Sequence, residues 1–279
     1  YNVADFYDLF GPTKSSRKGY SLALGHTRTL VYDQPRQLDL NVDVAAWGGL
    51  ETLPDYQNVG ASFEELFTGT ARLDYRNLRF SLGAVDYEKG VKSSLILSSN
   101  LVENRNFASL IGTLDLGVPT LFEHGSVWLR TAAGVAPPER DEPFSNFFFG
   151  GFGNNYVDHH DTKRYRDWYA FPGYELNELG GTNFVKATVD WNIPPLRFAK
   201  VGRPSFYASW IRTSLFGMAL ATNVDRADLR RENFSVGAQI DLRMTLLNHL
   251  DLTASVGYAV GFSEDRIRTD ELMLSLKLL

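Results

Sequence analysis

Hydrophobic and polar residues alternate with a period of two along most of the chain, which predicts strands rather than helices. The clearest stretch covers residues 234–246. Its apolar members share one face, namely Phe234, Val236, Ala238, Ile240, Leu242, Met244 and Leu246, whereas the polar Gln239, Asp241 and Arg243 lie on the other. This stretch is roughly twice the usual strand length. It approaches the about 9–11 residues with which a tilted strand crosses a bilayer.

Similar alternation predicts eleven more strands, at residues 18–31, 38–44, 66–76, 78–88, 91–102, 107–116, 126–136, 185–193, 205–217, 252–262 and 272–278. The strand at 205–217 is the least regular, because Arg212 interrupts its apolar face. The total of about twelve is even, as in bacterial outer-membrane barrels. Most connections are short, but residues 137–181 form a long loop rich in Gly, Asn and aromatic residues.

The polar face of these strands distinguishes a soluble sheet from a membrane barrel. Soluble sheets usually carry Lys and Glu on the solvent face, whereas the face from Thr253 to Gly261 is small and neutral. The mean hydropathy of −0.21 is compatible with a barrel, because lipid-facing and lumen-facing residues alternate. We therefore predict an all-β fold: a transmembrane antiparallel β-barrel of about 12 strands with an in-folded long extracellular loop. Residues 17–279 would form the barrel and residues 1–16 a periplasmic lead-in.

Compartment and upstream sequence stay open at this point. No window approaches the run of about 18 apolar residues that a membrane helix requires. Residues 1–12 include Asp5 and Asp8 and do not have the pattern of a signal peptide. Either the chain is cytosolic or its leader has been removed, and a periplasmic region upstream of Tyr1 is a plausible expectation.

Composition and local motifs argue against several functions. A net charge of −5 and a pI near 5.6 argue against a nucleic-acid binder with a basic face. The absence of cysteine excludes a thiolate metal site and a thiol nucleophile. Residues 158–161, Asp-His-His-Asp, can bind metal chemically, but neighbours on an extended chain point in opposite directions, which favours a polar loop tip. We find no catalytic triad spacing, nucleophile elbow or phosphate loop. We therefore expect no enzyme, no metal and no cofactor.

One segment resembles a known family. Phe171-Pro172-Gly173-Tyr174-Glu175 and Gly180-Gly181 precede a strand that ends in Asp190 and is followed by Pro194-Pro195. This segment resembles the BamA/TamA/two-partner-secretion superfamily, also called the bacterial surface antigen family. There the sixth extracellular loop carries an Arg-Gly-aromatic motif, folds into the barrel and is followed by five strands, the number that we predict here. The resemblance implies a bacterial outer-membrane protein that inserts or translocates proteins or lipids, without a cofactor.

The chain also departs from that family. Pro172 replaces the loop Arg, and no acidic residue lies between Asp190 and Asp225 to act as its partner. Because removing one partner alone would leave a buried charge uncompensated, a joint loss is physically consistent. The family has about sixteen strands and periplasmic repeats, and Leu279 replaces a common C-terminal aromatic residue. We therefore expect aromatic and backbone contacts to hold the loop as a lid.

The expected lid contacts are specific. Gly173, Gly180 and Gly181 should lie where the backbone closely approaches the barrel wall. The wall beside Gly257, Ala259 and Gly261 has little side-chain volume, and loop aromatics can fill it; the candidates are Phe144, Phe147, Phe148, Phe149 and Phe152. These rings either form a lid or merely order a surface loop.

Polar residues on the predicted lumen face are Lys186, Asp190, Gln239, Asp241 and Arg243. They either line a polar path, grip the lid or satisfy one another. Arg226, Arg230 and Arg231 lie on a predicted outward loop, where they either contact lipopolysaccharide phosphates or are simply solvated.

Three functions follow from these expectations. The first is insertion or translocation of an unknown client at a weak seam between residues 18–31 and 267–279, with outer-membrane lipids as partners. The alternatives are a passive small-solute channel and a membrane anchor for a periplasmic domain.

Overall fold

The computed structural model describes residues 2–3, 17–50, 63–199, 201–203, 205–263 and 269–278. These residues form strands, connections and two short 3-10 helices, η2 (Pro143–Ser145) and η3 (Arg164–Arg166). In the described part of the chain, no helix is long and apolar enough to cross a membrane.

Among the described residues the main sheet has fourteen strands, of which eleven are long. They are β3 (Tyr20–Asp33), β4 (Arg36–Gly48), β5 (Leu66–Arg79), β6 (Lys89–Val102), β7 (Arg105–Pro119), β8 (Ser126–Val135), β12 (Asn183–Asn192), β15 (Phe206–Thr222), β16 (Arg231–Leu246), β17 (Leu250–Ser263) and β18 (Thr269–Leu278). The strand predicted at residues 78–88 is wrong. Strand β5 ends at Arg79, and Gly83 within the following connection has a φ of +97°, which is incompatible with a continuing strand.

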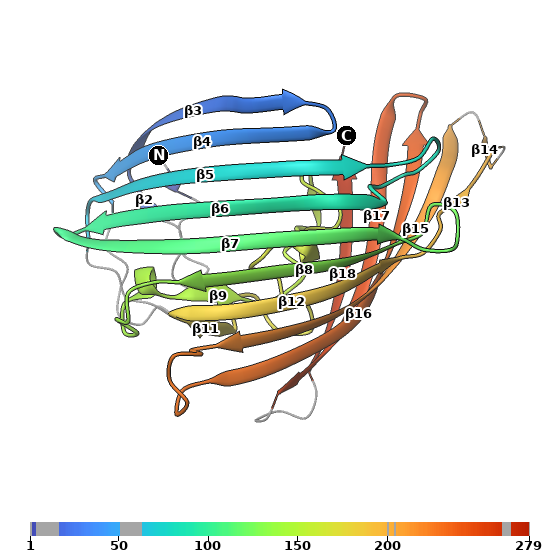
Figure 1. Ribbon diagram of the computed structural model, residues 1–279. Coiled ribbons are helices and arrows are strands. Elements are labelled where there is room, and N and C mark those ends of the chain that lie inside the picture. Colours follow the sequence, from blue (N-terminus) through green and yellow to red (C-terminus); the bar gives the residue numbers. More distant parts are fainter. Residues whose placement is uncertain are drawn as a thin grey trace.

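Every long strand pairs antiparallel with its neighbours, in the order β3-β4-β5-β6-β7-β8-β12-β15-β16-β17-β18. Figure 1 shows the sheet curving around the long loop, with β3 and β18 as its outer long strands. Within the described residues these two strands are not hydrogen-bonded to each other, so the sheet is open. The described residues therefore confirm the all-β sheet, but they do not show the closed barrel of about twelve strands that the sequence predicts.

The number of long strands is eleven, so the even strand count expected from the sequence no longer supports a barrel. With eleven strands that alternate in direction, β3 and β18 run the same way. A closed antiparallel barrel needs an even number of strands, so β3 and β18 can join directly only as a parallel pair.

Successive connections alternate between two ends of the sheet (Figure 1). The connections β3–β4, β5–β6, β7–β8, β12–β15 and β16–β17 lie at one end, which we call the short-turn end. The short strands β13 (Leu196–Arg197) and β14 (Gly202–Arg203) pair with β15 there. The long loop, residues 137–181, enters from the opposite end. It contains β9 (Phe147–Phe149), β10 (Val157–Asp158) and β11 (Leu179–Gly181), and β9 pairs with β11. Near the N-terminus, β1 (Asn2–Val3) pairs with β2 (Arg17–Lys18).

The sheet has the polarity of a membrane protein rather than of a soluble one. On β16 the apolar Val236 and Ile240 are 52% and 48% exposed, whereas Gln239 and Asp241, on either side of Ile240, are fully buried. Strand β12 repeats this arrangement, since Val185 and Val189 are exposed and Lys186 is buried. An outward apolar face of this extent requires apolar surroundings. The buried polar face is the one that the long loop covers.

Candidate functional site

The turn that resembles the family motif, at residues 171–175, is hydrogen-bonded to the last strands of the sheet. Glu271 of β18 accepts hydrogen bonds from the backbone N–H of Gly173, at 3.0 Å, and of Phe152, at 3.1 Å. The Ser235 hydroxyl of β16 donates to the Pro172 carbonyl, and Thr269 of β18 donates to the Gly173 carbonyl. The motif turn is therefore fixed through its backbone, by side chains of β16 and β18.

Gly173 is required in this turn for two reasons. Its φ is +92°, and a Cβ there would lie 2.6 Å from the Gly261 nitrogen and 2.9 Å from the Val260 carbonyl carbon. A Cβ at Gly181 would lie 2.9 Å from the Thr222 side chain, which is also a close approach. Gly180 differs from the expectation. A Cβ at this position would lie 3.6 Å from its nearest atom, which is an ordinary van der Waals distance, and Gly180 is exposed.

Aromatic rings of the loop fill the space between it and the sheet. The Phe152 ring lies against Gly257, and Phe171 and Tyr174 lie beside each other on the same side of the loop, with Tyr174 next to Gly261. Phe147 and Phe149 instead pack edge-on against Phe184 of β12, with centroids at 4.9 and 4.7 Å. Of the five Phe candidates for the Gly257–Gly261 wall, Phe152 contacts that wall, whereas Phe147 and Phe149 pack elsewhere. Phe148 is only half-buried, and Phe144 belongs to a separate cluster with Phe63 and Phe107.

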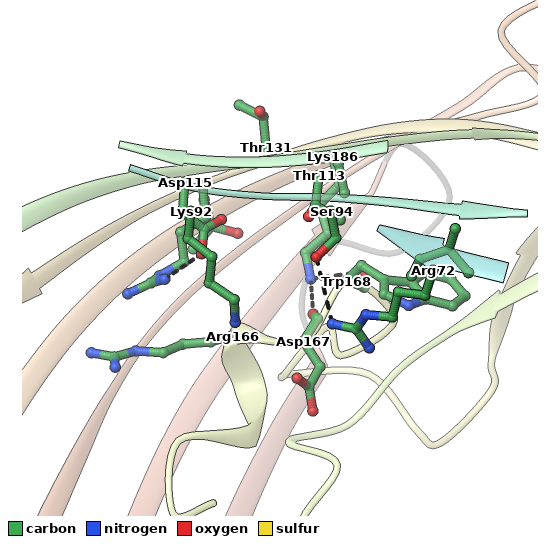
Figure 2. A pocket seen from close by; sticks show the side chains of 14 residues that line it. Arg72, Lys92, Ser94, Thr113, Asp115, Thr131, Arg166, Asp167, Trp168 and Lys186 are labelled. Atoms are coloured by element: carbon green, nitrogen blue, oxygen red, sulfur yellow. Dashed lines mark hydrogen bonds and ion pairs between the residues drawn. The ribbon is translucent and has the colours of Figure 1, made fainter. Parts of the chain in front are cut away.

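Lys186 of β12 holds the loop from the opposite wall. Its ammonium donates to the backbone carbonyls of Asp167, at 2.9 Å, of Trp168, at 3.2 Å, and of Ala170. Figure 2 shows this side chain reaching from the strand to the loop backbone. Three carbonyl partners satisfy all three ammonium protons, so Lys186 acts as a fixed anchor rather than as an available cation.

A charge network lies deeper, where η3 meets the wall. Asp190 of β12 accepts from Arg166 of the loop at 2.9 Å and from the Tyr165 hydroxyl at 3.0 Å, and Arg130 of β8 lies 3.3 Å away. The Asp190 side chain is fully buried. A loop arginine therefore pairs with a wall aspartate after all, and the expectation that both partners are missing is wrong. The arginine comes from six positions before Pro172 rather than from the motif itself.

Asp86, in the β5–β6 connection, joins this network from the short-turn end. One of its carboxylate oxygens lies 2.9 Å from Arg166, 3.4 Å from Arg212 of β15 and 3.7 Å from Lys163 of the loop. Burial alone would raise the pKa of this carboxyl, but Arg166, Lys163 and Arg212 hold the pKa of Asp86 well below its usual range. Asp86 therefore bridges two loop cations and one wall cation.

Two further ion pairs balance the charges around Asp86 and Asp190. Arg212 also pairs with Asp241 of β16, at 2.8 Å, and Arg130 pairs with Asp115 of β7, at 2.7 Å. The network thus contains four acids (Asp86, Asp115, Asp190 and Asp241) and four basic side chains (Arg130, Lys163, Arg166 and Arg212). We call this set the charge network. Burial, followed by the neighbouring Arg166 and Arg212, holds the pKa of Lys163 well below its usual value.

The two other predicted lumen residues have different roles. Gln239 donates to the Thr162 carbonyl of the loop, at 2.7 Å, and to Asp241, at 2.6 Å. Arg243 pairs with Asp251 at 3.1 Å near the short-turn end, so its ion pair connects two strands and not the loop.

Four residues that hold the loop were not predicted from the sequence, namely Asp86, Lys163, Arg166 and Arg212. Two signals were present. The loop carries the basic run from Lys163 to Arg166, and Arg212 interrupts an apolar face, as an inward-pointing residue would. Asp86 had no signal of its own, because the pattern assigned it to a strand.

Little open space remains between loop and wall at this point. The cavity at this point measures about 70 Å³. Its lining includes Arg72, Lys92, Thr113, Lys186 and residues 166–168 of the loop, which are labelled in Figure 2. Ligand pockets usually measure about 300–1,000 Å³. The loop is therefore closely fitted to the wall, with room for only a few water molecules.

The other candidate residues are explained by local contacts. Among the described residues no group of His, Asp and Glu is arranged to hold a metal ion, and this includes residues 158–161. Arg226 pairs with Asp228 at 3.2 Å, and Arg230 pairs with Glu232, all at exposed positions. Arg231 begins β16 and is exposed.

A comparison with protein families matches residues 62–202, half of the chain, to the model of the OMP85 superfamily. The matched range includes the long loop, Asp190 and the strand that carries it. The chain belongs to the OMP85 superfamily. This confirms the resemblance to BamA/TamA-like proteins and places the chain among outer-membrane β-barrel proteins, which act in insertion and transport rather than in catalysis. A search of curated proteins found no match.

Proposed function

We propose that the protein is a bacterial outer-membrane barrel that inserts or translocates proteins or lipids, with residues 137–181 as a lid inside the lumen. The observation that carries this proposal is how the loop is fastened. Its motif turn is bound by Glu271 of β18, and its η3 turn is bound by Asp190 of β12 and by Asp86 at the short-turn end. A loop fixed at both ends of the sheet covers the polar face on β12, β16 and β18.

The proposed route is lateral, between the two outer strands. Strands β3 and β18 each have an edge without a long partner strand in the described structure. In the hydrocarbon core of a membrane, unpaired backbone groups are costly, so an edge of this kind favours pairing with an incoming strand. The client's own N–H and C=O groups would be satisfied at the same time, and no cofactor or covalent step is needed.

Reconstitution tests this function directly. Lipid vesicles containing the purified protein would be mixed with a urea-unfolded outer-membrane barrel, and its folding followed by heat-dependent migration on gels. We expect folding at least tenfold faster than in vesicles that contain an unrelated closed barrel. Equal rates in the two preparations would contradict insertion as the function.

A passive channel is the second candidate, and one observation favours it. The polar contacts between β3 and β4, such as Thr27 with Asn41 and Thr29 with Asp39, are exposed and not covered by the loop. Water can therefore reach part of the polar face. In planar bilayers, large steady currents would favour the channel, whereas flickering or nearly silent traces would favour the occluded barrel.

The third candidate is a membrane anchor, in which residues 1–16 lead from a periplasmic domain into the barrel. The reading frame upstream of Tyr1 would test this candidate, because a periplasmic domain must be encoded there.

A further inference from the structure

The C-terminal strand has a partner on its outer edge that comes from the loop. On one side β18 pairs with β17 along its whole length, from Thr269 to Leu278. On the other side its strand partner within the described residues is β10, which pairs in parallel, Val157 with Leu276 and Asp158 with Lys277. The Leu276 amide donates to the Tyr156 carbonyl at 2.7 Å.

Side chains extend this contact in both directions. Before β10, the Asn154 amide donates to the Ser275 hydroxyl at 3.2 Å. After β10, a ring nitrogen of His159 lies 3.1 Å from the Leu278 carbonyl, and Asp161 lies 3.4 Å from the Lys277 ammonium. The loop therefore follows the last four described residues of β18 in register.

The pairing does not serve to bury apolar side chains. Tyr156 is 83% exposed and Val157 is 56% exposed. What β10 supplies to β18 is hydrogen bonding of the edge, over two residue pairs. A contact that is short, exposed and made by backbone and polar side-chain groups rather than by apolar packing is one that another strand can replace without disrupting a core.

The direction of β10 matches that of a closing strand. Because the eleven long strands alternate in direction, β3 runs parallel to β18, and so does β10. Each backbone N–H of β18 has one donor proton, so the Leu276 amide cannot serve β10 and another strand at once. Occupation of this edge by β10 and by another strand is therefore mutually exclusive.

We propose that β10 is a built-in cover of the β18 edge: residues 156–158 block pairing at the end of this strand, and an incoming β-strand must displace them. This inference rests on the proposed function, because a strand-accepting edge is needed only if clients enter there. It adds the regulation of that site, since the loop controls access to the edge as well as filling the polar side.

A disulfide tests the cover, because the chain has no cysteine of its own. Asp158→Cys combined with Lys277→Cys joins register partners of β10 and β18. The matched control combines Thr253→Cys with the same Lys277→Cys, and so joins β18 to β17 on its other edge. Both proteins would be compared oxidised and reduced, in lipid vesicles.

The probe is a synthetic peptide of residues 20–33, the sequence of β3, with a photoreactive group for cross-linking to β18. We expect the reduced protein to capture at least tenfold more peptide than the oxidised β10–β18 protein. The oxidised control should capture as much as its reduced form. Equal capture by both forms of the β10–β18 protein, or no capture by either, would overturn the inference.

The folding assay separates this inference from the proposed function. If the wild-type protein does not accelerate folding of the unfolded barrel, the insertion function fails, whatever the peptide result. If it does, oxidation of the β10–β18 protein should slow folding at least tenfold, and reductant should restore the rate. Unchanged folding after complete oxidation would overturn the cover and leave the insertion function intact.

Discussion

The substitution Asp86→Asn should release the inner part of the long loop. Removing one partner of a buried ion pair costs about 3–5 kcal/mol. We expect a cost of about 3 kcal/mol for two reasons. The Asn side chain keeps a hydrogen-bond acceptor at position 86. Arg166 also keeps Asp190 as a partner, and Arg212 keeps Asp241. About 3 kcal/mol corresponds to a roughly hundredfold larger population of the open loop.

The other groups of the network limit this cost. Without Asp86, four basic side chains face three acids. Lys163 keeps hydrogen bonds to the Asn192 and Ser214 side chains of the wall without Asp86. Part of the network therefore stays satisfied, which is a further reason to expect about 3 rather than 5 kcal/mol.

Limited proteolysis in detergent measures the open population. When the loop opens and closes faster than it is cut, the cleavage rate follows the equilibrium fraction that is open. We expect cleavage within residues 137–181 to be roughly a hundredfold faster for Asp86→Asn than for the wild type. Arg166→Gln should have a similar effect. The free-energy change of the double variant should be well below the sum of the two single changes, because the two residues share one contact.

Asp74→Asn is the matched control. Asp74 lies on β5, in the same hairpin as Asp86, and it pairs with Arg72 at 2.8 Å and with neighbouring strand residues rather than with the loop. Its cleavage rate should stay within about twofold of the wild type. An unchanged rate for Asp86→Asn would refute the role of Asp86. Equal acceleration in both variants would show that the substitution weakens the whole sheet instead.

Three further predictions concern the motif turn, the aromatic contacts and the orientation of the sheet. Gly173→Ala should speed the same cleavage at least tenfold, because its Cβ would lie 2.6 Å from a backbone nitrogen; a wild-type rate would contradict the close approach. Phe152→Ala should lower thermal stability in detergent by about 3–5 kcal/mol, whereas Phe148→Ala, at a half-buried position, should cost clearly less; equal losses would argue against the packing. Spin labels at positions 42 and 43 of β4 should report opposite environments, with Val42 accessible to oxygen and Asp43 to a water-soluble relaxant, and the reverse order would mean a soluble sheet.

The sheet could be predicted from the sequence because one physical rule governs every strand. Side chains alternate across a strand, so a strand with lipid on one face and polar groups on the other must alternate in composition. The same rule does not mark where a strand ends. The sequence predicts a strand at residues 78–88, but β5 ends at Arg79, and Gly83 lies in the connection with a φ of +97°. Strand number, and with it parity, was therefore less predictable than strand identity.

The contacts that hold the loop could be predicted only where the residues involved are close together in the sequence. The motif turn and the Gly173 contact follow from residues that are neighbours along the chain. The pair of Asp86 with Arg166 joins residues 80 positions apart, and Arg212 lies 126 positions from Asp86. Which of the loop's basic residues meets which acid depends on how the loop folds back, and no periodicity in the sequence encodes that path.

Charge balance of the interior is the constraint from which the ion pair follows. Asp190 is predicted to face the lumen, and a buried carboxylate without a cation is too costly to persist. Its position therefore requires a basic partner, which Pro172 at the motif position cannot be. Lys163 and Arg166 lie in the same loop, and Arg212 interrupts the apolar face of its predicted strand. Taking charge balance of the interior as the constraint, rather than the family's motif position, leads to these residues. The same charge balance predicts that a related chain without Arg166 also lacks Asp190 or Asp86.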